Sequence, residues 1–244
     1  MPENKEVVKV KTNKAVRFHL LILFMLFMML TLPGLSESQK NLQTGSQISA
    51  EQVVQKLEAR LKSISTLRAD FQQFYYSPLT REPAAGRGQV FIRRPHRMRW
   101  EYAAPEKQIF LLKDGQFWLY FPEDRQLIKN AHTREVQESE ILGLLAGNFS
   151  LSQRYRIEFS SFPGEGKNAY QLRLEPLEEG QFSHIFLEID GQTWLITRAI
   201  FFEPDGGKLE YRFSRVRTGL KLPEELFELK IPPDCEIIEA GQIK

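Results

Sequence analysis

The stretch that decides the fold is residues 86–102, which read GRGQVFIRRPHRMRWEY. A strand opens at the two glycines and ends at Pro95, because proline cannot donate to a β-ladder and biases the preceding Arg94 toward extended geometry. After the turn the chain alternates strictly, with Met98 and Trp100 on one side and charged residues on the other. The stretch therefore predicts two successive strands of an antiparallel sheet.

Tight-turn signals continue this pattern toward the C-terminus. Two-residue hairpin turns favour Asp-Gly, and such sites separate apolar runs at Asp114-Gly115, Asp190-Gly191 and Asp205-Gly206-Gly207. Residues 155–159 and 170–174 each present an apolar face and flank a glycine-rich turn. About ten short strands joined by tight turns predict an antiparallel sheet, sandwich or barrel.

Two segments interrupt the β pattern. Residues 49–52 form a capping-box sequence, and apolar residues then recur every three or four positions, which predicts an amphipathic helix over about residues 50–63. Residues 139–146 predict a second, short helix that is apolar nearly all round. Such a helix must be buried on several sides or must exchange one partner for another.

Several predicted strands are apolar on both faces. Residues 109–112 and 117–121 carry large apolar side chains at nearly every position. One apolar face suffices for a sheet whose other face meets water. Either the helices cover one face, or the sheet curls around an apolar interior. The fold class is therefore mainly β with some α.

The N-terminus has the pattern of an export signal. A basic stretch precedes an apolar run at residues 20–30, which is about half the ~20 residues that a membrane-spanning helix needs. Pro33-Gly34 and small residues follow, so residues 1–38 are predicted to be a cleavable signal peptide, with an uncleaved anchor as the alternative. Residues 39–48 are predicted to be a flexible leader, and residues 49–244 a single domain.

Charge and cysteine content exclude several functional classes. The chain has 33 Lys and Arg against 31 Asp and Glu, and cleavage after Ser38 would remove five cations and three acids, which leaves 28 of each. A neutral chain has no electrostatic footprint for nucleic acid. The single cysteine, Cys235, excludes an internal disulfide framework and a cysteine-based metal cluster.

A search for catalytic motifs finds none. The histidines of the predicted mature chain, His96, His132 and His184, lack metal-ligand spacing, and there is no nucleophile elbow, phosphate loop or dinucleotide motif. The acidic pairs Glu178-Glu179 and Glu224-Glu225 are predicted to be solvated surface. We therefore predict no metal, no cofactor and no catalytic residue. A hydrolase would require these histidines and acids to converge in space.

Arg94 is the unusual charged residue of the deciding stretch. It shares strand parity with Val90 and Ile92, so its guanidinium points where their apolar side chains point, whereas Arg93 points to the other face. A buried arginine must find acceptors. The alternative is that Arg94 lies past the rim of the apolar region and reaches water.

These residues together resemble the LolA family of periplasmic lipoprotein carriers. The resemblance covers nearly all of the predicted mature chain and is carried by residues 86–102, Pro105, the run Asp114–Tyr120, Phe71 with Gln73, the helix at 139–146 in the place of a lid helix, and residues 227–233 in the place of the closing strand. No cysteine stands directly after the N-terminal apolar run, in residues 31–38. That favours the soluble carrier over the lipid-anchored LolB receptor of the same fold.

The resemblance implies an incomplete antiparallel β-barrel whose helices form a lid over a hydrophobic concave face. It implies a monomeric, non-enzymatic carrier that takes lipoproteins from an inner-membrane ABC transporter to a LolB-like outer-membrane receptor. In that interpretation Arg94 is a lid latch, bonded to lid-helix carbonyls when the protein is empty. The residues expected to contact acyl chains are Phe71, Val90, Ile92, Met98, Trp100, Trp118, Ile141, Leu144 and Leu145.

Two further alternatives remain open from the residues. One is an exported carrier of another amphiphile, such as a lipid or glycolipid, on the same scaffold. The other is a sensor of envelope stress that binds a membrane protein, although such proteins usually carry a second domain.

Overall fold

The computed structural model describes residues 48–129, 143, 150–162 and 168–239, all of which belong to one compact unit, Ser46–Lys244. The predicted signal peptide and nearly all of the predicted leader lie outside the described residues. So does the predicted helix at 139–146, apart from Gly143, which is helical.

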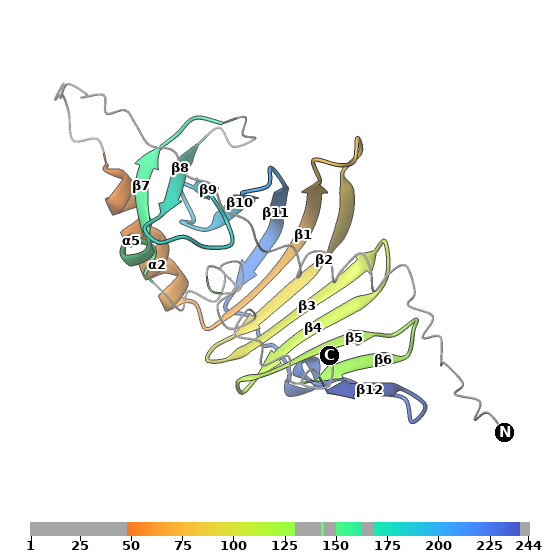
Figure 1. The fold of residues 1–244 in the computed structure, drawn as a ribbon. Helices are drawn as coiled ribbons and strands as arrows, with labels where there is room; N and C mark the ends of the chain where they lie inside the picture. The colour runs from red at the N-terminus through yellow and green to blue at the C-terminus, as the bar shows by residue number, and fades with distance from the viewer. Residues whose placement is uncertain (1–47, 130–142, 144–149, 163–167, 240–244) are drawn as a thin grey trace. The chain divides into compact units, whose positions relative to one another are not determined.

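The described chain forms one 12-stranded sheet in the order β12-β6-β5-β4-β3-β2-β1-β11-β10-β9-β8-β7 (Figure 1). Its strands are β1 (Thr66–Tyr76), β2 (Ala84–Arg93), β3 (Arg97–Ala104), β4 (Gln108–Lys113), β5 (Gln116–Phe121), β6 (Gln126–Lys129), β7 (Tyr155–Phe159), β8 (Ala169–Pro176), β9 (His184–Asp190), β10 (Ile196–Phe202), β11 (Lys208–Thr218) and β12 (Glu236–Glu239).

The sheet is open, because the strands at its two ends, β12 and β7, do not pair with each other within the described residues. This confirms the prediction of a mainly β, incomplete barrel. Neighbouring strands are antiparallel with one exception in the described chain: β12 runs parallel to β6. The closing strand expected at 227–233 is wrong, since β12 begins only at Glu236, beyond Pro232 and Pro233, which cannot donate to a ladder.

The hairpin predictions have mixed outcomes. Asp114 and Gly115 adopt positive φ angles of 50° and 80° and join β4 to β5 directly, as predicted. The two-residue turn at Asp190-Gly191 is wrong, because residues 191–195 connect β9 to β10. There the Asp190 carboxylate accepts from the backbone N–H of Gln192 (3.1 Å) and Thr193 (2.7 Å), which stabilises the wider turn.

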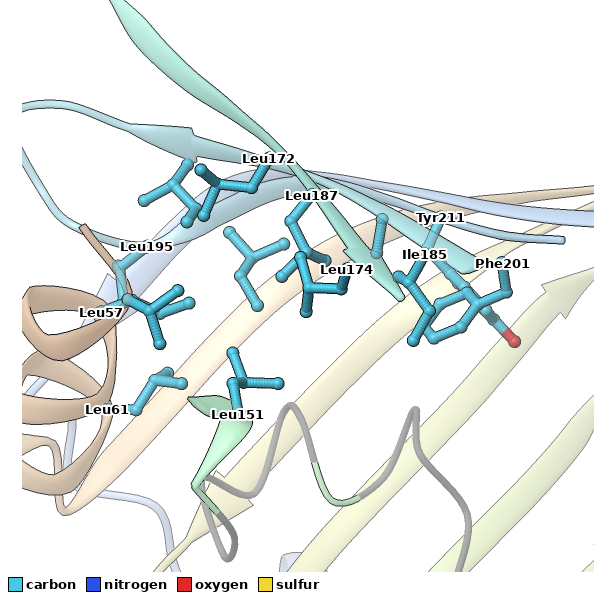
Figure 2. Packing of buried hydrophobic residues seen from close by; sticks show 14 of the residues in the cluster. Leu57, Leu61, Leu151, Leu172, Leu174, Ile185, Leu187, Leu195, Phe201 and Tyr211 are labelled. Carbon is cyan, nitrogen blue, oxygen red and sulfur yellow. The ribbon is translucent and has the colours of Figure 1, made fainter. Parts of the chain in front are cut away.

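The helix α2 (Ala50–Ser63) forms where the sequence predicts it. Ser49 Oγ accepts from the backbone N–H of Gln52 at 3.2 Å, and Gln52 Oε1 accepts from that of Ser49 at 2.8 Å, so both halves of the capping box are present. Its buried stripe, including Leu57 and Leu61, points toward leucines of the sheet (Figure 2). A second helix, α5 (Leu151–Arg154), adds Leu151 to this contact.

One large hydrophobic cluster joins α2 and α5 to a single face of the sheet, which we call the core face. Its members on β1, β2 and β3 are continuous with those on β8 to β11, so the same face is apolar across most of the sheet.

The opposite face of β2–β5 is covered by a C-terminal segment, residues 220–229, which we call the strap. The strap includes the short 3₁₀ helix η1 (Glu224–Phe227), and Phe227 is fully buried against Phe91 and Leu111. The strap explains why β4 and β5 are apolar on both faces. Within the described residues, no helix is both long enough and apolar enough to cross a membrane.

Candidate functional site

Five of the residues expected to contact acyl chains lie together on the core face. Phe71, Val90, Ile92, Met98 and Trp100 belong to the large cluster and are at most 4% exposed. Strand pairing aligns them, because Ile92 is opposite Met98 and Val90 is opposite Trp100 across β2 and β3. The parity of residues 86–102 therefore predicted the faces of Val90 and Ile92 on one strand and of Met98 and Trp100 on the next.

Aromatic rings fill the centre of this face. The ring of Phe71 lies 4.8 Å from that of Trp100 and 4.9 Å from that of Tyr102, in tilted and edge-on geometries that aromatic pairs prefer. The Tyr102 hydroxyl bonds to Gln73 Oε1. Burial raises the pKa of Tyr102 well above its ordinary value, and burial raises that of Tyr211 to about 12, so both stay neutral within this apolar surface.

Trp118 does not share this face. It is paired with Leu111, which is opposite Arg99, and it packs with Phe91 and Leu111 beneath the strap. Its placement among the acyl-contacting residues is therefore corrected. Because β5 carries apolar side chains on both faces, its sequence alone does not show whether the side with Trp118 packs on the core face. The other expected contacts, Ile141, Leu144 and Leu145, lie outside the described residues.

A small cavity lies between α2 and the core face. Its volume is about 30 Å³, and it is lined only by apolar residues: Leu61, Leu67, Ala69, Val90, Ile92, Leu195, Ile196, Phe213 and Val216. That space would hold about two water molecules, whereas sites for small ligands measure roughly 300–1,000 Å³. A long acyl chain would fit between α2 and the core face only if the two separated.

A larger cavity of about 300 Å³ lies on the opposite face of β8–β11. It is lined by charged and polar groups that include Glu188, Asp190, Arg198 and Arg212. Arg198 and Arg212 donate to Glu210 Oε1 at 2.8 and 2.6 Å; burial raises the pKa of that carboxyl, but these bonds outweigh burial, so the pKa lies below its ordinary value. Displacing water from such groups with hydrocarbon is costly, so this cavity is unsuited to acyl chains.

Arg94 connects the sheet to α2. Its Nε donates to the backbone oxygen of Ile64, the C-cap residue of α2, at 2.9 Å, and its backbone N–H donates to the oxygen of Ser65 at 2.8 Å. Burial lowers the pKa of Arg94. A guanidinium at a helix C-terminus also meets the negative end of the helix dipole. This partner lies on the first helix; the predicted helix at 139–146 is outside the described chain.

Arg93, the neighbour of Arg94, binds the strap instead. It donates to the backbone oxygen of Leu222 at 3.1 Å and forms an ion pair with Glu224, which also pairs with Arg97. The sequence pattern correctly predicted that Arg93 faces away from Arg94. It did not indicate the strap. Glu224 lies at the surface as predicted, with 43% of its side chain exposed, but its ion pairs with Arg93 and Arg97 were not predicted. Arg93 and Glu224 are 131 positions apart, so no local pattern indicates their pairing.

The described histidines do not converge. His96 lies in the β2–β3 turn and His184 begins β9, at opposite ends of the sheet's strands. His132 lies outside the described residues. In the part of the chain that the structure describes, no group of three or more His, Cys, Asp or Glu side chains could hold a metal ion.

The family model for outer membrane lipoprotein carrier protein LolA matches residues 62–230. This chain belongs to the LolA family. A relative from Methylococcus capsulatus, named outer-membrane lipoprotein carrier protein, is 26% identical over 185 residues, covering 75% of this chain and 86% of that protein. One of the same name from Chromobacterium violaceum is 31% identical over 186 residues, covering 76% and 86%.

One solved structure is similar in fold. An uncharacterized conserved protein from Thermus thermophilus superposes with a TM-score of 0.53 at 15% identity, over 78% of this chain and 98% of that one. At this identity the likeness concerns the fold alone. Phe71, Val90, Ile92, Met98 and Trp100 belong to the same hydrophobic cluster as α2, and Arg94 bonds to the C-cap residue of α2.

Proposed function

We propose that this protein is a periplasmic carrier that shields the acyl chains of lipoproteins between the inner and outer membranes. The observation that carries the proposal is the wholly apolar cavity at the contact of α2 with the core face, in a chain of the LolA family. The names of its curated relatives, outer-membrane lipoprotein carrier proteins, support the same role.

The energetics require a carrier that covers its ligand only in part. Three acyl chains hold roughly 45 methylenes, and at about 0.8 kcal/mol each their complete burial would be worth about 35 kcal/mol. Non-covalent affinities saturate near about 18–21 kcal/mol, and a carrier must also release its ligand. Closure of the empty site therefore has to compete with the acyl chains.

The contact between α2 and the sheet supplies that competition. In the closed state Leu57 and Leu61 fill the space that hydrocarbon would take, and Arg94 holds the C-terminal end of α2 through Ile64. Acyl chains displace the helix, and the re-formation of these contacts favours release. This role of Arg94 as a latch belongs to the proposal.

The proposed carrier works in the periplasm with a partner in each membrane. We expect an inner-membrane ABC transporter to load the carrier and a LolB-like outer-membrane receptor to unload it, with no catalytic step. Export by the signal peptide at residues 1–38 would place the mature N-terminus near Gln39. N-terminal sequencing of the periplasmic protein checks this; membrane-bound protein that retains residues 1–38 would contradict it.

The decisive experiment incubates the purified mature protein with inner-membrane vesicles that contain labelled lipoprotein and the energised transporter. We expect lipoprotein to appear in the soluble fraction in a complex with the protein, and to move to outer-membrane vesicles afterwards. If no lipoprotein is released, while mass spectrometry of the purified protein finds a co-purified lipid or glycolipid, the protein carries another amphiphile instead.

A further inference from the structure

Arg60, in the last turn of α2, has an unusual set of partners. Its Nε donates to the backbone oxygen of Thr193 at 3.3 Å, and its Nη atoms reach Ser63 Oγ and Thr218 Oγ1 at 3.4 Å each. All three acceptors are neutral, the bonds are long, and Arg60 makes no ion pair with any described carboxylate. A carboxylate or phosphate would be the stronger acceptor for a guanidinium.

The position of Arg60 is at the end of the apolar cavity. Its chain neighbour Leu61 lines that cavity, Thr193 lies two residues before the lining residue Leu195, and Thr218 pairs with the lining residue Leu67. Arg60 therefore bridges α2, the β9–β10 turn and the end of β11 across one end of the cavity. Arg94 bonds to α2 at the same end.

The charges of the described chain are separated along the strands. At the cavity end, in the strand ends, the turns, the strap and the last turn of α2, the cations are Arg60, Lys62, Arg93, Arg94, Arg97, Lys113, Lys129, Arg217 and Lys221, and the acids are Asp114, Glu158, Asp190, Glu224, Glu228 and Glu239. At the other end the cations are Arg81, Lys107, Arg125, Arg156 and Lys208, and the acids are Glu82, Glu106, Glu123, Asp124, Glu175, Glu178, Glu179, Glu203, Asp205 and Glu236.

The cavity end thus carries nine cations against six acids, an excess of positive charge where the apolar cavity ends. Summed charges of one sign raise the local concentration of ligands of the opposite sign and orient their approach. A ligand with a hydrocarbon part and an anionic part would be drawn with its anionic part to this end.

We propose that the ligand enters at this end and that Arg60 binds an anionic group beside its acyl chains, a lipid phosphate or an acidic residue of a lipopeptide. The inference rests on the proposed function and names the ligand's polar chemistry. Binding replaces the bonds of Arg60 to Thr193 and Thr218 with charge-assisted ones, which frees the last turn of α2 from the strand ends and lets the cavity widen.

The test measures binding to the purified mature protein with two matched pairs of probes. One pair is lysophosphatidylglycerol and lysophosphatidylcholine with the same acyl chain, the first anionic and the second zwitterionic. The other is a triacylated lipopeptide with glutamates, or with glutamines, after the lipidated cysteine. The variants are Arg60→Gln and, as a matched control, Arg81→Gln, an exposed arginine in the β1–β2 turn at the other end of the strands.

We expect wild type to prefer the anionic member of a pair by about tenfold at low salt, since charge-assisted bonds are about twice as strong as neutral ones. The preference should shrink as salt rises. Arg60→Gln should lose it and keep its affinity for the neutral member, while Arg81→Gln behaves as wild type. A preference in one pair alone identifies the source as the lipid phosphate or the peptide.

Two results would overturn the inference. If wild type binds both members of each pair with equal affinity, the protein has no anionic site, although it still binds acyl chains. If Arg60→Gln still prefers the anionic member of a pair, other cations bind the anionic group and Arg60 does not. If neither member of either pair binds at all, the proposed carrier function fails along with the inference, so the two failures can be told apart.

Discussion

Arg94 shows how one inward charge can connect two elements. Its strand parity with Val90 and Ile92 directs it toward the core face, and there it bonds the carbonyl of Ile64 at the end of α2. Hydrogen bonds that involve a charged group contribute about 1.5–3 kcal/mol, which is small against the stability of a domain but shifts a two-state equilibrium by about tenfold or more.

The first prediction is that Arg94→Leu shifts the protein toward its open, ligand-bound state. The variant should accept lipoprotein from inner-membrane vesicles but release it to acceptor membranes about tenfold more slowly than wild type, because closure no longer drives release. The measurement is the rate of transfer to outer-membrane vesicles.

The control for this prediction must avoid Arg93, which holds the strap. Arg87 is preferable, because it is an exposed arginine on the same strand, β2. Arg87→Leu should transfer at the wild-type rate. Equal, wild-type rates for Arg94→Leu and Arg87→Leu would mean that Arg94 is only a rim charge.

Met98 tests the assignment of the faces. It is 3% exposed on the core face, so Met98→Glu would place a carboxylate in the path of the acyl chains. We expect binding of a fluorescent acyl lipid to fall at least tenfold and unfolding stability to fall by about 1–3 kcal/mol, the cost of burying a poorly satisfied polar group.

Two companions of Met98→Glu separate these effects. Met98→Leu conserves apolar volume and should bind lipid as wild type does. Ala103→Glu adds the same charge at an exposed position of β3 and should affect neither measurement. Unchanged lipid binding by folded Met98→Glu would show that acyl chains do not pass this face.

At the scale of elements, the strap and α2 lie on opposite faces of the sheet. The strap covers β2–β5, whereas α2 contacts β7 and borders the cavity lined by β1, β2, β10 and β11. The strap is held by Arg93 and Arg97 through Glu224, and by Arg99, which donates to the backbone oxygens of Leu226 (3.1 Å) and Glu228 (3.2 Å). It thereby buries the apolar outer side of β2–β5 and leaves the core face as the apolar surface that α2 and a ligand can compete for.

The strap should contribute stability that depends on pH. Hydrogen bonds from Arg93 and Arg97 hold the pKa of Glu224 below its ordinary value of 4.5. Because the folded pKa is the lower one, this contribution is fully present above about pH 4.5 and is lost as pH falls through the folded pKa. The difference in urea midpoint between wild type and Glu224→Gln should therefore be constant from about pH 7 to 5 and shrink below about pH 4.5.

Glu225 provides the comparison, since it is exposed and makes no ion pair within the described chain. Glu225→Gln should differ from wild type by a small amount that hardly changes over the same pH range. A Glu224→Gln difference that stays constant down to pH 3 would mean that the pairing with Arg93 and Arg97 does not stabilise the folded state.

At the scale of the whole molecule, the closed cavity is too small for the acyl chains of the proposed ligand. A space of about 30 Å³ cannot accept an acyl chain, so binding between α2 and the core face would move the helix. The bonds that oppose this movement lie at the C-terminal end of α2, where Arg60 and Arg94 connect it to the strands.

Hydrogen exchange should detect that movement. On binding a long-chain lipid, amides in the last turn of α2, near residues 60–64, should exchange faster, whereas the amides of β3 should be unchanged. The lysolipid headgroup without its acyl chain serves as the control and should change neither. Increased protection of the last turn of α2 in the complex would mean that the ligand binds without displacing the helix.

The sequence by itself determined the local elements and their faces. Strict alternation in residues 97–102 placed Met98 and Trp100 together, the capping box began α2 at Ala50, and parity turned Arg94 inward. These features depend on side-chain period and on contacts a few residues apart, which a sequence displays directly. The family resemblance added the open sheet.

The tertiary structure alone decided the features that depend on distant pairings. Both sides of β5 are apolar, so its sequence does not show which side faces the core. The pairing of Trp118 with Leu111 places Trp118 on the side that the strap covers. Glu224 became the partner of Arg93, and Arg60 the bridge to Thr218, across separations of 131 and 158 residues. An exposed acid and a helix-surface arginine look ordinary in sequence, because their roles come from strands that the fold brings beside them.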